Sequence, residues 1–414
     1  MFRLLKSRFS LLLITLSMSA AALSGQPVAV SFALIHQGRS AATIGLVLGI
    51  LSMVFVLSLL IGGIAGDRLG RSRVVKFASI LRILGTLLSI TSLHAGRSVA
   101  IFAVSVAVVS LANGLFMPNI TGMVLDTSGG AELAKANGMR GVVEALGTSY
   151  GPAAVGLVVA FLSPEAGLMA IELFLVICSL SLFAMRYKSE ASSAKHEGIV
   201  HQLRVGFVAL KAKKWCWSII AGYALMHLLA FPAFYVLGPI ISQHHLGGAR
   251  SWGIILGLQG LGSIIGSLSA TRYRFRYPLR YTVAFSFFGA SVFIALGVTF
   301  NVTLIAGAAL LTGFAFGQFQ VVWETFLQLS FEVDVLSRVS SYDWMGSSSL
   351  FPVGQIATGI VATLISPQLI VLFAGVVVVA ISGVLLSVRD VWGAVAPRSM
   401  KGYVQDDANS NVSS

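Results

Sequence analysis

Twelve long apolar stretches, separated by short polar segments, follow one another along the chain. Each is close to the roughly 20 residues that an α-helix needs to cross the hydrocarbon core of a bilayer. Their apolar residues run on without the alternation of barrel strands, so the pattern predicts membrane-spanning helices. The predicted spans are residues 11–35, 41–62, 74–94, 99–124, 138–162, 166–186, 215–239, 251–270, 281–300, 303–328, 341–365 and 368–388.

Composition supports the membrane prediction and narrows the partners. Apolar residues make up 56% of the chain and charged residues only 10%, whereas soluble domains carry about 25% charged residues. The net charge of +13 would suit a nucleic-acid-binding protein, but the basic residues gather in alternate loops between the spans. Such a bias reports the orientation of a membrane protein, and we expect a lipid bilayer and no nucleic acid as a partner.

The orientation follows from the 28 lysines and arginines. With the N-terminus placed in the cytoplasm, only Arg39, Arg97 and Arg250 fall in outer loops, while Arg82 and Arg140 fall within or at the edge of spans. Both termini are therefore predicted to be cytoplasmic. We expect a multi-pass protein of a plasma membrane, of the bacterial inner-membrane type.

A polar, lysine-rich segment divides the spans into two sets of six. Its periodicity predicts a helix lying on the inner membrane surface. The predicted organisation is a six-helix bundle over 1–186, a cytoplasmic linker over 187–214, a second six-helix bundle over 215–388 and a polar cytoplasmic tail over 389–414.

The two sets of spans match each other at a constant offset of 203 residues. The offset pairs these positions: Gly114 with Gly317, Leu133 with Leu336, Gly151 with Gly354 and Gly156 with Gly359. A fixed register across several spans favours an internal duplication. The predicted fold is an all-α membrane protein of twelve transmembrane helices in two pseudo-symmetric six-helix bundles.

The segment Gly63–Arg73 is a charged stretch between the second and third spans. Its fixed positions resemble G-x-x-x-D-R-x-G-R-[RK], the loop between helices two and three of the major facilitator superfamily, and only the last position differs, being Ser72. We expect a short hairpin there, with Gly70 providing the turn. The residues assigned to this gating loop are Gly63, Asp67, Arg68, Gly70, Arg71 and Arg73.

The resemblance implies that this loop holds the cytoplasmic side closed in the outward-facing state. Asp67 is then expected to contact the N-terminus of span eleven near Asp343, with Arg68 as the bridge between the two carboxylates. Arg71 is expected to pair with Asp126 at the end of span four. Substrate would bind near the midplane between the two bundles.

The glycines and the proline of span five suggest a direction of transport. They resemble in part the span-five motif of drug:proton antiporters, and a kinked packing helix is the alternative. The residues of this predicted kink are Gly147, Gly151, Pro152 and Gly156. Leu133–Gly138 and its second-half counterpart Leu336–Ser341 resemble the secretion-effector branch of the superfamily, which includes macrolide and siderophore exporters.

Charged side chains inside spans are costly and mark functional candidates. Glu144 is either a proton-exchanging carboxyl or the partner of Arg140 in an ion pair one turn away. Glu324 is a second candidate for proton coupling or a residue of the membrane interface. Arg82 would pair with Glu144 or another carboxylate, or extend towards the cytoplasm.

Spans one, four, seven and ten line the pathway in the superfamily. Neutral polar groups near their midpoints would hydrogen-bond a substrate, and aromatic side chains would provide apolar contacts; contacts between helices are the alternative. The candidates are Gln26, Asn113, Phe116, Tyr223, His227, Gln318 and Trp323.

These features predict a monomeric secondary transporter that exports a small amphipathic compound, such as a drug, an antibiotic or a secondary metabolite, by proton antiport. One alternative is a nutrient uptake permease working by proton symport, and another is a non-transporting receptor or scaffold. We find no Gly-x4-Gly-Lys phosphate-binding motif, no nucleophile–base set and no metal-ligand spacing. We therefore expect no enzyme activity, no cofactor and no metal site.

Overall fold

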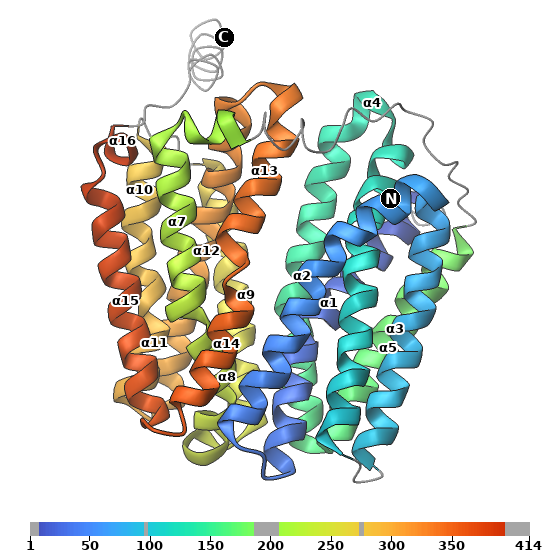
Figure 1. The fold of residues 1–414 in the computed structure, drawn as a ribbon, viewed down its shortest axis with the longest axis vertical. Coiled ribbons are helices and arrows are strands. Elements are labelled where there is room, and N and C mark those ends of the chain that lie inside the picture. The colour runs from blue at the N-terminus through green and yellow to red at the C-terminus, as the bar shows by residue number, and fades with distance from the viewer. Residues whose placement is uncertain (1–7, 95–97, 186–206, 273–276, 394–414) are drawn as a thin grey trace, which may run out of the picture.

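The computed structural model describes residues 8–94, 98–185, 207–272 and 277–393. All regular elements in these ranges are helices. They form two groups that stand side by side, α1–α5 in one and α7–α16 in the other, and the first and last described helices, α1 and α16, begin and end at the same, upper end of the molecule (Figure 1).

The first group contains five long helices. They are α1 (Arg8–His36), α2 (Ala41–Leu69), α3 (Arg71–His94), α4 (Val99–Phe161) and α5 (Pro164–Ala184). The two predicted spans at 99–124 and 138–162 are confirmed as the apolar segments Val99–Val124 and Met139–Phe161. Both belong to α4, which remains helical through the segment between them. That segment contains alanine, leucine, glutamate and lysine, which favour a helix.

The second group is more divided. Its elements are α7 (Lys214–Leu229), α8 (Phe231–Ile241), the π-helix η2 (Ser242–Leu246), α9 (Ala249–Arg272), α10 (Pro278–Phe285), the 3₁₀-helix η3 (Ser286–Ala290), α11 (Ser291–Val298), α12 (Val302–Ser330), α13 (Val333–Ser348), α14 (Phe351–Val361), α15 (Pro367–Ser387) and α16 (Arg389–Trp392). Breaks precede Pro232 and Pro352, where a proline in the helix interior would remove a hydrogen bond.

Within the described ranges, eleven helical segments are long and apolar enough to cross a membrane. The predicted span at 341–365 is divided between α13 and α14, so neither piece alone is long enough. Of the predicted linker and tail, residues 207–211 are helical and Arg389–Trp392 forms α16. Residues 187–206 of the linker, with most of the predicted surface helix, and residues 394–414 of the tail lie outside the described residues.

The buried core is shared at one end of the molecule and divided at the other. One hydrophobic cluster joins both groups of helices and takes in the later part of α1, from Ala22 to Leu34. The early part of α1, with Leu12 and Leu16, belongs to a second cluster made only by the first group. A third cluster, which includes Trp323, belongs only to the second group. The two groups therefore pack together at the end away from the start of α1.

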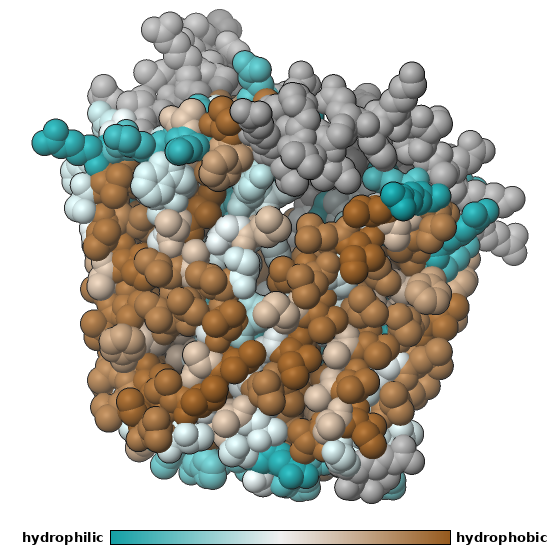
Figure 2. Space-filling view, viewed as in Figure 1, coloured by the Kyte–Doolittle hydropathy of each residue, from teal (hydrophilic) through white to brown (hydrophobic). Residues whose placement is uncertain are grey.

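Glycines make the close contacts between the groups at this shared end. A Cβ on Gly45 of α2 would lie 2.9 Å from the Cα of Gly359 on α14, and a Cβ on Gly156 of α4 would lie 2.8 Å from the Cα of Gly253 on α9. A bulkier residue would force these helices apart. At the opposite, upper end, a pale and less hydrophobic seam separates the brown flanks of the molecule (Figure 2).

The contacts also reflect the duplicated sequence. Gly151 packs on α1 and its counterpart Gly354 packs on α7, while Gly156 and Gly359 both contact the other group. Residues related by the sequence offset thus occupy equivalent places in the two groups, as expected for pseudo-symmetric bundles.

Candidate substrate-binding site

The gating-loop residues lie on helices rather than in a hairpin loop. The helix α2 continues through Asp67 and Arg68 to Leu69, and α3 begins at Arg71. The turn between them is Gly70 alone, with φ +87° and ψ 128°. The expectation of a loop over Gly63–Arg73 was therefore wrong, because one glycine in a conformation that other residues rarely adopt is enough for the turn.

Gly70→Ala should destabilise the protein, because an L side chain at this φ is strained by about 1–3 kcal/mol. Gly63→Ala is the matched control, since Gly63 lies on the same segment in open space within α2. We expect a lower midpoint of thermal unfolding in detergent for Gly70→Ala and little change for Gly63→Ala. Equal effects of the two substitutions would contradict the role given to the turn.

The expected contact between Asp67 and Asp343 is not made in this structure. Asp343 instead accepts a hydrogen bond of 2.9 Å from Nε1 of Trp323. Asp67 is partly buried, Arg68 and Arg73 are exposed, and no hydrogen bond or ion pair is recorded for Asp67 among the described residues. The physical reason is the separation of the two groups' cores at this end of the molecule.

Arg71 packs over Gly122, where a Cβ would lie 2.6 Å from its guanidinium carbon. Gly122 is one turn before Asp126 on α4. The side chain of Asp126, the partner expected from the sequence, lies outside the described residues.

The span-five glycines allow close packing. Gly147 and Gly151 face the backbone of α1 around Ser17 and Ala21, and Gly156 faces α9. Pro152 lies inside α4, between these contacts. The segment thus serves as an interface both within the first group and between the groups.

Glu144 forms an ion pair with Arg140, whose Nε lies 2.9 Å from the carboxylate, and about a quarter of each side chain is exposed. This contact excludes the expected pairing of Glu144 with Arg82 in this state. Glu324 is exposed on α12 and accepts a hydrogen bond from Gln320.

Arg82 is buried in the first group, and none of its contacts with the described residues is to a carboxylate. One guanidinium nitrogen lies 3.1 Å from Oγ of Ser19, another lies 4.0 Å from Sγ of Cys178, and Cζ lies 4.5 Å from the ring centre of Phe116. Only 1% of Arg82 is exposed. The expectation that Arg82 pairs with an acid or extends to the cytoplasm was wrong, because an aromatic ring and small polar groups surround the cation.

Two of the polar candidates in the first group bond to each other. Nδ2 of Asn113 on α4 donates to Oε1 of Gln26 on α1 over 3.3 Å, and both side chains are buried. Phe116, one turn along α4, is fully buried beneath Arg82. Gln26 and Asn113 therefore remain candidates that need a small movement to meet a substrate, whereas Phe116 belongs to the bundle interior.

The second group presents a continuous set of aromatic rings. Tyr223 on α7 stacks on Phe319 of α12 with ring centres 4.3 Å apart, and Phe319 stacks on Trp323 at 6.0 Å. His227, one turn along α7, contacts the rings of Phe231 at 4.9 Å and Phe351 at 5.7 Å. We call these residues the aromatic surface: Tyr223, His227, Phe231, Phe319, Trp323 and Phe351.

Parts of this surface remain open. Tyr223, His227 and Phe351 are half-buried, while Trp323 is buried. His227 uses Nδ1 to bond the carbonyl of Tyr223 at 2.9 Å, which leaves its other ring nitrogen for a ligand. Gln318 points the other way and donates to Oγ of Ser269 over 2.5 Å. The prediction that Gln318 reaches the pathway is therefore not supported by this geometry, because the amide joins two helices of one group.

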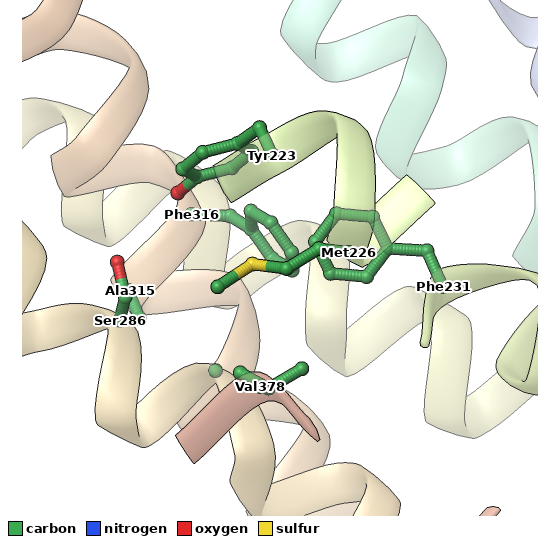
Figure 3. A pocket seen from close by; sticks show the side chains of 8 residues that line it. Tyr223, Met226, Phe231, Ser286, Ala315, Phe316 and Val378 are labelled. Atoms are coloured by element: carbon green, nitrogen blue, oxygen red, sulfur yellow. The ribbon is translucent and has the colours of Figure 1, made fainter. Parts of the chain in front are cut away.

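A small pocket lies behind the aromatic surface, inside the second group. Tyr223, Met226, Phe231 and Phe316 line one side of it, and Ser286 and Val378 lie opposite (Figure 3). The hydroxyl of Tyr223 points at Ser286. The pocket is mostly apolar, and Tyr223 belongs both to its lining and to the aromatic surface.

Sequence reasoning missed Phe319 and Phe351 in this surface, and Ser19 and Cys178 around Arg82. Phe319 had a detectable signal, since it lies four residues from Trp323 on the same predicted span and four residues set side chains on one helix face. The other three come from different helices, and no local pattern marks them.

Two helical bundles that span a membrane, share a core at one end and separate at the other define a secondary transporter, which moves a small molecule through a site between its bundles. The chain belongs to the major facilitator superfamily, because residues 12–349 match that family. As a member of that family it is a membrane transporter of a small-molecule substrate and not an enzyme.

Solved structures agree with this fold at low sequence identity. The nucleoside transporter NupG matches with a TM-score of 0.73 and 14% identity, over 92% of this chain and 98% of that chain. The peptide transporter POT in complex with sulfate matches with a TM-score of 0.71 and 13% identity, over 94% and 96%. A POT family transporter in complex with a thioalcohol-conjugated peptide gives 0.72 and 12%, over 91% and 95%. No curated protein matches the chain.

Proposed function

We propose that this protein is a monomeric exporter of a small amphipathic organic compound, driven by proton antiport. The observation that carries the proposal is the aromatic surface of α7, α8, α12 and α14, whose rings contact one another within the second group. Stacked rings with few hydrogen-bonding groups suit a flat or apolar ligand better than a sugar.

The polar groups near this surface are neutral, apart from the carboxylates at its end. The amides of Gln26 and Asn113 in the first group and the second ring nitrogen of His227 can each exchange one hydrogen bond with a substrate. Such a site favours amphipathic ligands, which are mainly apolar and carry a few hydrogen-bonding groups. The span-five and Leu133–Gly138 resemblances support export over uptake.

The charge bias along the chain supports cytoplasmic termini in an inner membrane. The seam then opens towards the cytoplasm, which is the side where an exporter collects its substrate. The halves would rock about the glycine contacts between α2 and α14 and between α4 and α9 to reach the opposite state.

Uptake of a nutrient is the second candidate. The observation that favours it is the likeness of fold to a nucleoside transporter and to peptide transporters. The aromatic surface would then stack a base or an aromatic side chain, and the direction of transport separates the two candidates.

The test is transport into inverted membrane vesicles with an acidic interior, using ethidium and erythromycin as probes. We expect accumulation that disappears when the pH gradient is dissipated. Right-side-out vesicles with an acidic exterior are the matched arm for uptake, with uridine and a dipeptide as probes. Uptake there without accumulation of either export probe would overturn the proposal in favour of a permease.

Glu144→Gln should keep the gradient dependence of transport. Glu144 forms a partly exposed ion pair with Arg140, and such pairs contribute about 0–1 kcal/mol, so the rate should change less than about fivefold. Arg140→Gln is the companion variant and should impair transport more, because it leaves Glu144 without its partner. The readout is the ratio of accumulation with and without the gradient; loss of that ratio in Glu144→Gln would make Glu144 the proton carrier.

A further inference from the structure

Asp343 lies at the end of the aromatic surface. Its Oδ2 accepts the indole hydrogen bond of Trp323, and this bond of 2.9 Å joins α13 to α12. Trp323 stacks on Phe319, which stacks on Tyr223. The carboxylate of Asp343 on α13 thus holds the indole of Trp323, which is the last ring in the stack formed with Phe319 and Tyr223.

Trp323 depends on this bond for its orientation. The ring of Trp215 meets Trp323 edge-on at 5.9 Å and closes its other side. Since the indole nitrogen has a single hydrogen to donate, Asp343 is the partner of its only polar group. Trp323 is 4% exposed, so water does not replace a lost bond without movement of the ring.

No described basic side chain forms an ion pair with Asp343. The titratable and charged groups around it are Cys216 and Lys213 at the start of α7, Glu324 on α12, and Arg338 and Tyr342 on α13 itself. The ammonium of Lys213 lies 4.9 Å from the ring centre of Phe331, and Glu324 is near enough for its negative charge to act on Asp343. The charge of Asp343 is therefore opposed by one neighbouring carboxylate.

The strength of the indole bond depends on that charge. A hydrogen bond to an ionised carboxylate is roughly twice as strong as one between neutral groups. Uptake of a proton by Asp343 would weaken the bond and allow the indole to turn out of its stack with Phe319. The packing of the aromatic surface would change with it.

We propose that Asp343 is a positioning residue that links a proton to the aromatic surface: ionised, it holds Trp323 in the stack, and protonated, it releases the ring. This inference rests on the proposed function and deepens it. Proton binding at Asp343 and ligand binding on the stacked rings then oppose each other, which is the coupling that an antiporter requires.

The test is fluorine NMR of the full-length protein labelled with fluorotryptophan, in nanodiscs, over a range of pH from mildly acidic to mildly alkaline. Trp323→Phe assigns the Trp323 resonance among the six tryptophans. We expect that resonance to shift with pH in the otherwise unaltered protein and to stay constant in Asp343→Asn, which keeps the side-chain shape without the titration. Glu324→Gln should move the midpoint of the shift to lower pH without abolishing it.

Two results would overturn the inference. One is a Trp323 resonance that does not change with pH, and the other is a shift that survives in Asp343→Asn. A purely structural role for Asp343 would alter the resonance in the variant but would not give the pH dependence. Because this readout needs no transported compound, failure of export in vesicles leaves it intact, and the two proposals fail separately.

Discussion

Gly45→Val should abolish transport by preventing the two bundles from closing at their shared end. A Cβ at Gly45 already meets the backbone of Gln355 and Gly359 on α14, so two further methyl groups cannot be accommodated without separating α2 from α14. Overpacking of this kind costs about 1–3 kcal/mol. The cost applies only to the state described here, in which the two bundles pack together at the shared end. It therefore shifts the population ratio of the two transport states by about 5–150-fold away from that state.

The shift can be followed with a cysteine at Ile356, whose side chain packs against Gly49 in the same interface. A membrane-impermeant thiol reagent, applied from each side in turn, should react with Ile356→Cys faster in the Gly45→Val background than in its absence. Cys178 and Cys216 are buried and should stay unreactive. Gly383→Val is the matched control, because Gly383 faces open space. Transport by Gly45→Val at the unaltered rate would refute the role of this interface.

Tyr223→Ala should weaken ligand binding by at least about tenfold. The ring of Tyr223 is half-buried, stacks on Phe319 and is the central member of the aromatic surface. Its removal takes away about 1.5–3 kcal/mol of apolar burial and about 0.5–1.5 kcal/mol of ring–ring contact, part of which the ligand provides. The measurement is a fluorescence titration of purified protein with ethidium.

Tyr223→Phe separates the ring from the hydroxyl. The hydroxyl points at Ser286 in the pocket behind the surface, away from the seam. We therefore expect Tyr223→Phe to bind ethidium nearly as well as the unaltered protein. Equal weakening in both variants would assign binding to the hydroxyl and contradict the stacking account.

The spans and the fold could be predicted from the sequence because they depend on local signals. A run of apolar residues is sufficient to predict a span, and the charged segment Gly63–Arg73 resembles the loop motif of the major facilitator superfamily. The breaks before Pro232 and Pro352 were not predicted, because a proline alone does not decide a break: Pro118 and Pro152 lie inside the unbroken α4. The helix across the segment after Val124 does not follow from the apolar runs, because that segment is polar and only its helix-forming residues favour the continuation of α4.

The candidate site was harder to predict because it depends on how each helix is rotated. Gln318 and Trp323 lie on one helix, yet Gln318 turns towards α9 and Trp323 towards α13. That rotation is set by packing against residues far away in sequence. Arg82 illustrates the same limit, because its neighbours Ser19, Phe116 and Cys178 come from three other helices and none is the expected acid.

The most direct test of the central claim, that the bundles alternate about the shared core, measures two distances by pulsed electron paramagnetic resonance. Spin labels at Arg68→Cys and Ser340→Cys report the open end, and labels at Ser40→Cys and Leu364→Cys report the shared end; all four positions are exposed. Ethidium together with a change of pH should shorten the first distance and lengthen the second. Two distances that stay fixed, or that change in the same direction, would contradict the account.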